Sequence, residues 1–150
     1  MNSLTLVFRL TVFALAFTGF AQMPIFARYY LADVPGFAWT ADYYFNHVAH
    51  YILAIVLLAI LGWRLPRLLQ RSTWSSMDVA VGLCWIAIVL TGMVRVMKNQ
   101  PESYFSPTLV MWVDWGHLFF VMLLAPLALA HSMTRRARTR ASGRRLDTPK

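Results

Sequence analysis

One apolar stretch runs from Trp112 to His131 with the sequence WVDWGHLFFVMLLAPLALAH, long enough to cross a bilayer as a helix. It carries a histidine near each end, His117 and His131, which are 131 − 117 = 14 positions apart. Fourteen steps of about 100° return to within roughly 40° of the starting direction, about 21 Å further along a helix. Both imidazoles are therefore expected to face the same side, one near each membrane face. Because ionisable residues inside a membrane are costly, each of them needs a specific reason.

The composition agrees with a membrane protein. Of the 150 residues, 59% are hydrophobic and 13% are charged, and the mean hydropathy is +0.54. A soluble domain of this size could not bury so much apolar surface, so lipid is expected to solvate most of it. The single cysteine, Cys84, lies inside an apolar run and is expected to be a packing residue. One cysteine excludes a disulfide framework, a covalent c-type haem and a thiolate-bound iron–sulfur cluster.

Four apolar segments are predicted to be membrane-spanning helices, at about residues 4–23, 45–63, 77–96 and 109–131. They predict an all-α fold, an integral membrane four-helix bundle with up-down-up-down connections over residues 1–132. A basic tail at residues 133–150 follows. The first segment could be a cleaved signal peptide, because TGFA precedes Gln22, but the deep position of Arg9 favours a retained helix. No internal sequence repeat is apparent.

The net charge of +8 is concentrated in two places. One is the connection between the second and third segments, and the other is the C-terminal tail (Arg64, Arg67 and Arg71; Arg135, Arg136, Arg138, Arg140, Arg144, Arg145 and Lys150). Basic connections favour the cytoplasmic side, so both termini are predicted to be cytoplasmic, in a multi-pass protein of the bacterial inner membrane. The tail can also contact anionic lipid. No groove-reading element accompanies it, so nucleic-acid binding is not expected.

The histidines indicate a haem site. His50 on the second segment and His117 on the fourth are expected at similar depth toward the outer face, which is the minimum set for bis-imidazole haem b. His47, three positions before His50, could ligate instead, or could contact a haem propionate or a quinone. His131 has no histidine partner near the inner face, so an interfacial position or a quinone contact is expected, and one non-covalent haem. Asp114 could hold an imidazole, accept a proton or cap its helix.

Other residues near the expected outer face suit the same site. Arg95 and Lys98 end the third segment, and Arg28 lies in the loop after the first segment. These cations could pair with the anionic haem propionates. Gly19 and Gly92 would let a flat macrocycle approach the helix backbone, although glycine is also common where membrane helices pack.

Four parts of the chain together resemble a known family of membrane subunits: TGFAQMPIFARYY, HVAHYILA, TGMVRVMKN and DWGHLFFVMLLAPLALAH. They are similar to the b-type cytochrome subunits of bacterial respiratory oxidoreductases, such as the formate dehydrogenase gamma subunit and the hydrogenase cytochrome b. The likeness covers about residues 4 to 132. It implies that His50 and His117 ligate one haem, and that His131 matches a residue of a second haem that borders a quinone pocket. The partner of that residue on the first helix is missing here.

The resemblance implies an electron-transfer subunit without substrate chemistry of its own. Such a subunit would link the quinone pool to an iron–sulfur or multihaem partner subunit. Two alternatives remain open from the sequence. One is a membrane copper-binding or transport protein that uses His47, His50, His117 and nearby methionines such as Met93 and Met97. The other is a membrane anchor without haem.

Overall fold

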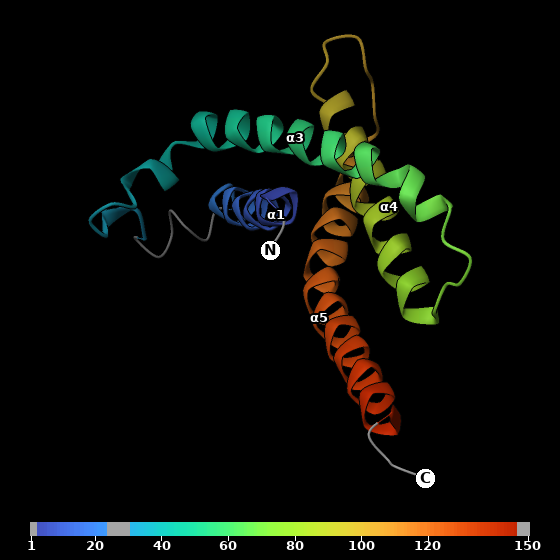
Figure 1. Cartoon of the computed structure of the whole chain (residues 1–150). Helices are drawn as coiled ribbons and strands as arrows, with labels where there is room; N and C mark the ends of the chain where they lie inside the picture. Colours follow the sequence, from blue (N-terminus) through green and yellow to red (C-terminus); the bar gives the residue numbers. More distant parts are fainter. Residues whose placement is uncertain (1–2, 24–30, 147–150) are drawn as a thin grey trace. The chain divides into compact units, whose positions relative to one another are not determined.

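The computed structural model describes residues 3–23 and 31–146, with side chains for residues 3–23 and 32–134 (Figure 1). The described part is helical and contains no strand. It has four long helices and two short 3-10 turns: α1 (Ser3–Ala21), η1 (Leu31–Asp33), η2 (Ala38–Ala41), α3 (Tyr43–Leu69), α4 (Ser76–Met97) and α5 (Pro107–Leu146). The predicted all-α fold is confirmed.

Each long helix contains a segment that is long and apolar enough to cross a membrane, which for α5 is Pro107–Thr134. Large apolar side chains are exposed along all four helices, and the few buried residues include polar Thr18 and Asn46 as well as apolar Leu57 and Ile60. So much exposed apolar surface is unlike a soluble domain and is expected where lipid is the solvent. The number, length and hydrophobicity of these helices are those of a multi-pass membrane protein.

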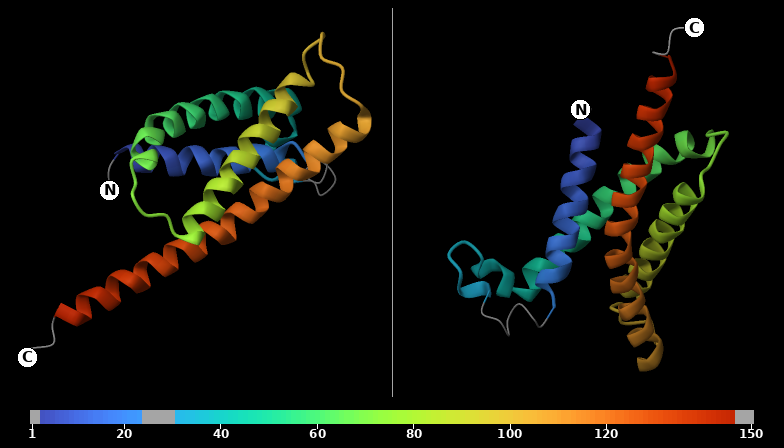
Figure 2. Two further views of the ribbon diagram at one scale, coloured as in Figure 1. Left: turned by 90° about the vertical axis from the view of Figure 1, so that its right-hand side faces the viewer. Right: turned by 90° about the horizontal axis from the view of Figure 1, so that it is seen from below.

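The chain divides into two compact units, Met1–Arg71 and Ser72–Lys150. In the first unit α1 packs against α3, and in the second α4 packs against α5, each pair forming a helical hairpin (Figure 2). Side-chain contacts show that the helices of each hairpin are antiparallel. In the first unit, for example, Arg64 near the end of α3 donates a hydrogen bond to the Leu4 carbonyl at the start of α1.

Residues of the connection that precedes α3 form hydrogen bonds with the first turn of that helix. Asp42 caps that helix by accepting a hydrogen bond from the Phe45 amide at 2.9 Å. Asn46 is fully buried, and its amide donates to the carbonyls of Trp39 and Asp42 at 3.1 and 2.7 Å. The Trp39 ring also contacts Phe17 of α1, with ring centroids 5.5 Å apart. These contacts fix where α3 begins, immediately before His47 and His50.

In the second hairpin, hydrogen bonds stabilise the start of α4 and join the middle of α4 to α5. Ser75 and Asp78 form a reciprocal capping box that satisfies amide groups at the start of α4. Cys84 is 3% exposed, and its thiol donates to the Phe120 carbonyl of α5 at 3.1 Å. Cys84 therefore packs between the helices, as its place in an apolar run predicted.

Two helices continue past the ends that the sequence predicted. Helix α3 ends at Leu69 rather than at about residue 63, and Pro66 lies inside its last turn. Helix α5 continues to Leu146, through most of the segment predicted to be a tail. Extending a formed helix is easier than nucleating one, and arginine has a high helix propensity, so basic residues after a span can stay helical.

Candidate functional site

His50 lies on α3 and faces α1 of its own hairpin. Its Nδ1 atom is 3.0 Å from the Thr18 hydroxyl, which is buried. The backbone of Gly19 lies beside the imidazole: a methyl group on that glycine would be 3.3 Å from Cε1 of His50. Glycine therefore allows the ring to lie close against α1.

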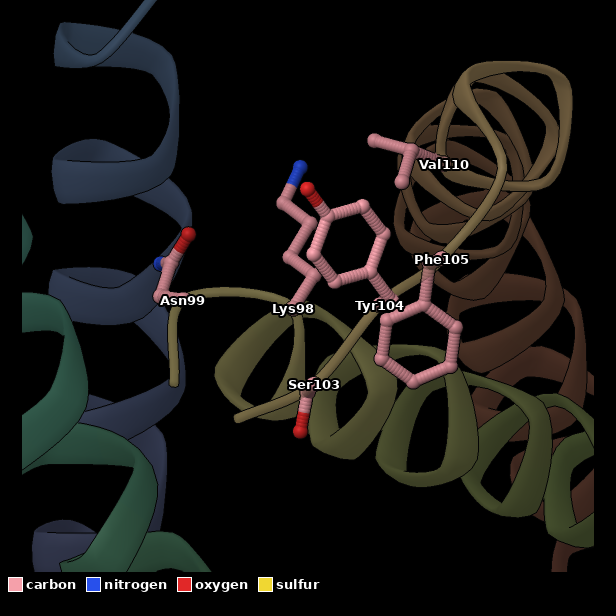
Figure 3. Close-up of a pocket in the computed structure, with 6 residues that line it drawn as sticks. All are labelled: Lys98, Asn99, Ser103, Tyr104, Phe105 and Val110. Atoms are coloured by element: carbon pink, nitrogen blue, oxygen red, sulfur yellow. The ribbon is translucent and has the colours of Figure 1, made fainter. Parts of the chain in front are cut away.

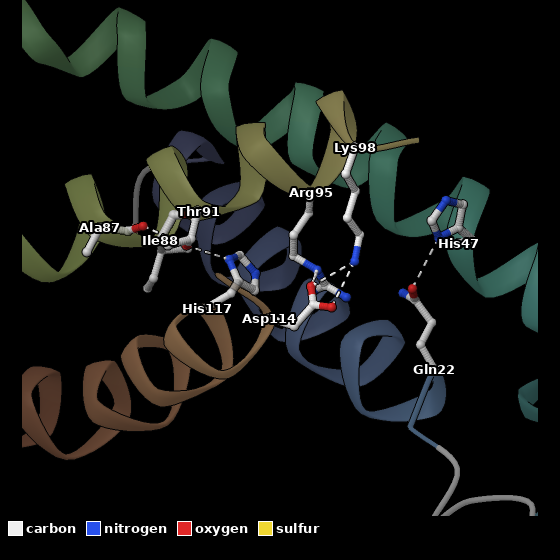
Figure 4. Close-up of polar contacts among 9 residues, drawn as sticks. All are labelled: Gln22, His47, Ala87, Ile88, Thr91, Arg95, Lys98, Asp114 and His117. Atoms are coloured by element: carbon white, nitrogen blue, oxygen red, sulfur yellow. Dashed lines mark hydrogen bonds and ion pairs between the residues drawn. The ribbon is translucent and has the colours of Figure 1, made fainter. Parts of the chain in front are cut away.

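His117 has the same surroundings in the second hairpin. Its Nδ1 atom is 2.9 Å from the Thr91 hydroxyl of α4 (Figure 4). A methyl group on Gly92 would lie 3.4 Å from Cε1 of His117. The glycines were predicted to make room for a flat macrocycle. In each hairpin, the described structure places the imidazole edge against the glycine.

Polar residues at equivalent positions extend the repeated arrangement. Four residues after each threonine lie Gln22 and Arg95, and three residues before each histidine lie His47 and Asp114. The Gln22 side-chain oxygen is 3.3 Å from Nδ1 of His47, and Nε of Arg95 is 2.8 Å from Oδ1 of Asp114. No repeat is apparent in the sequence, but in the structure each hairpin places a polar pair at these equivalent positions.

The repeat is hidden in the sequence because the two connections differ in length. The threonines are 91 − 18 = 73 positions apart, whereas the histidines are 117 − 50 = 67 apart. One alignment offset cannot therefore match both helices of each hairpin. A detectable signal exists within single helices: a Thr-Gly dipeptide on the first helix, and HVAH or DWGH on the second.

The predicted cations Arg95 and Lys98 both pair with Asp114. The Lys98 ammonium is 2.8 Å from Oδ2 of this carboxylate, while Arg95 binds Oδ1. Two cations and one carboxylate give this three-residue cluster a net charge of 2 − 1 = +1. Asp114 thus pairs with two cations, a contact that differs from the three roles expected from the sequence. Arg28 lies outside the described residues.

His47 lies at the end of its hairpin within an aromatic cluster. Its ring stacks on Tyr43 with centroids 5.5 Å apart, and its centroid is 4.3 Å from that of Tyr51. With Gln22 on its Nδ1 atom, His47 forms part of a polar and aromatic cluster one turn away from His50.

His131 has a partner that the sequence did not reveal. Its Nε2 atom lies 2.8 Å from Oδ1 of Asp78, and the two side chains are 21% and 10% exposed. The pair is at the opposite end of the second hairpin from the contact between Lys98 and Asp114. Asp78 also forms the capping box of α4 with the N-cap residue Ser75, so His131 is joined to the start of the neighbouring helix.

A surface depression of about 300 Å³ lies where α4 joins α5 (Figure 3). None of the four histidines lines it. Its lining residues are Lys98, Asn99, Ser103, Tyr104, Phe105 and Val110. Tyr104 is fully exposed, so the depression is a feature of the connection rather than an enclosed site.

Among the described side chains, no group of three or more His, Cys, Asp or Glu residues is close enough to hold a metal ion. Comparison with protein-family models, with curated proteins and with solved structures gives no match to this chain. The candidate site therefore depends on the two histidine arrangements themselves.

Proposed function

We propose that the chain is a membrane haem b electron-transfer subunit, with His50 and His117 as the two axial ligands of one non-covalent haem. The observation that carries this proposal is the equivalence of the two histidines. Each hairpin supplies one imidazole, with a threonine hydroxyl at Nδ1 and a glycine at the ring edge. Two residues with matching surroundings are expected where one group needs two identical ligands.

The donor chemistry of these residues fits haem b. Two imidazoles suit low-spin iron, and the bound group would supply reversible one-electron exchange without an open coordination position. His50 and His117 would hold and orient it. The cluster of Arg95, Lys98 and Asp114, with its net charge of +1, suits the anionic propionates.

The wider assignment extends this electron-transfer role. The subunit would exchange electrons between the quinone pool and an iron–sulfur or multihaem partner in a bacterial inner membrane. A quinone near His131 would lie at the end of the second hairpin that holds Asp78. The basic residues favour cytoplasmic termini. Contacts of Thr18 and Gln22 with α3 support keeping α1 in the mature protein.

The decisive experiment measures haem in the purified full-length protein by pyridine haemochrome titration and reduced absorption spectra. One haem b per chain is expected, with a low-spin spectrum. His50→Ala and His117→Ala should each abolish that spectrum, whereas His47→Ala and His131→Ala should retain it. Two haems per chain would contradict the proposed ligand set, and no haem would contradict the function. Copper analysis of the same sample tests the copper alternative.

A further inference from the structure

We propose that Thr18 and Thr91 are positioning residues that hold the proton of each facing imidazole on Nδ1. The Nε2 atoms of His50 and His117 then carry the lone pair that a metal requires. The significance for haem rests on the proposed function, but the tautomer itself follows from contacts within each hairpin.

The contacts of Thr18 determine which way its hydrogen bonds run. The Thr18 hydroxyl oxygen lies 2.8 Å from the Ala14 carbonyl oxygen, 3.2 Å from the Leu15 carbonyl oxygen and 3.0 Å from Nδ1 of His50. A hydroxyl has one hydrogen to donate, and carbonyl oxygens only accept. Of the three neighbours, Nδ1 alone can bring a hydrogen of its own. When Nδ1 donates to the hydroxyl oxygen and the hydroxyl donates to Ala14, both close contacts are hydrogen bonds.

The opposite tautomer leaves one close contact unsatisfied. If the hydroxyl donated to an unprotonated Nδ1, its oxygen would face the Ala14 carbonyl oxygen at 2.8 Å with no hydrogen between them. Two acceptors at that distance repel each other, and the environment is buried. An unmade hydrogen bond is costly in such a place. The packing therefore favours Nδ1–H.

The second hairpin repeats this arrangement. The Thr91 hydroxyl oxygen is 2.7 Å from the Ala87 carbonyl oxygen, 3.2 Å from that of Ile88 and 2.9 Å from Nδ1 of His117 (Figure 4). Two independent hairpins thus impose the same proton position.

A third threonine supplies a matched control. Thr11 is 5% exposed, and its hydroxyl donates to the Val7 carbonyl at 2.9 Å. Within the described part of the chain, no histidine contact accompanies this bond. The hydroxyl-to-carbonyl bond therefore forms in α1 without help from an imidazole, which supports the same donor role for Thr18.

Ligand histidines commonly donate their other N–H to an oxygen, which fixes the ring and its tautomer.

The test measures the tautomers in the haem-free full-length protein, labelled with ¹⁵N-histidine, above the usual titration range of the imidazole. In the wild type, ¹⁵N chemical shifts should show Nδ1–H at His50 and His117. Thr18→Val should change only His50, and Thr91→Val only His117. Thr11→Val should change neither, and Thr18→Ser should keep the wild-type tautomer. Nε2–H at His50 and His117 in the wild type, or no change in the valine variants, would overturn the proposal.

A second measurement links the tautomer to the metal and keeps the two proposals separable. In haem-containing protein, Thr18→Val and Thr91→Val should each raise the midpoint potential, because an imidazole that loses its Nδ1 hydrogen bond donates less charge to oxidised iron. Thr11→Val should not shift it. If the wild type binds no haem yet shows both Nδ1–H tautomers, the haem function fails and the positioning role stands.

Discussion

The Nε2 atom of His131 on α5 lies 2.8 Å from Oδ1 of Asp78 in the first turn of α4. The same aspartate caps α4, because its other oxygen accepts hydrogen bonds from the Ser75 amide and hydroxyl at 3.0 and 2.7 Å. One carboxylate therefore stabilises a helix start and joins it to the neighbouring helix. His131 is better explained by this structural contact than by iron ligation, since its Nε2 atom faces a carboxylate.

Removing this carboxylate should weaken the second hairpin without removing haem. Asp78→Ala loses a helix cap and a side-chain partner, each about 1 kcal/mol, so the free energy of unfolding in detergent should fall by about 2 kcal/mol. His131→Ala should cost about half as much. Ser76→Ala, at an exposed neighbouring position, is the control.

The same His131→Ala variant also tests the assignment of the haem ligands. Loss of the haem spectrum in His131→Ala, with retention in His50→Ala, would show that the ligands are assigned wrongly.

Adding a side chain at the two contact glycines should disturb the histidines. Gly19→Val and Gly92→Val place atoms where the imidazole edges lie, so haem content should fall. A methyl group on Gly62 or Gly82 would meet nothing within 4 Å. The same valine changes there should leave haem content unchanged. Equal losses at all four positions would indicate a general folding defect instead.

Charge changes around Asp114 should move the haem potential in opposite directions. Arg95→Gln removes a positive charge and should lower the midpoint potential, whereas Asp114→Asn removes a negative charge and should raise it. The Arg95 and Asp114 side chains are 38% and 37% exposed, so solvent weakens both effects. An interaction of about 0.5–1 kcal/mol corresponds to roughly 20–45 mV for one electron. Redox titration measures the shifts, and shifts of the same sign would place the haem propionates elsewhere.

Reporter fusions at both ends of the chain should give a cytoplasmic signal. The prediction follows from Arg64 and Arg67 at the end of α3, from Arg71 just after it, and from the basic residues after the α5 span. N-terminal sequencing of the mature protein should find α1 retained. A mature protein that begins near Gln22 would show that the first segment is a cleaved signal.

The sequence was sufficient to predict the four helices, because long apolar runs have few other folds available in lipid. The sequence also pointed to the four histidines as candidate functional residues, because ionisable side chains inside a membrane are energetically unfavourable. It did not identify Thr18, Thr91 or Asp78 as their contacts, because an isolated polar residue in an apolar helix carries no pattern that names the residue it faces. That information comes from the antiparallel packing. The ends of α3 and α5 were also predicted too early. The apolar run of each helix stops at Trp63 or His131, but the helix continues through the basic residues that follow.

Histidine, threonine and glycine make the same contacts in both hairpins, but the polar pairs beside them differ. A symmetric dimer of one hairpin would carry identical residues at every equivalent position. A single chain with two hairpins does not have that restriction. Here one hairpin has neutral Gln22 beside His47, while the other has the charged Arg95 and Asp114. The two histidines therefore share their immediate contacts while the charge next to them differs.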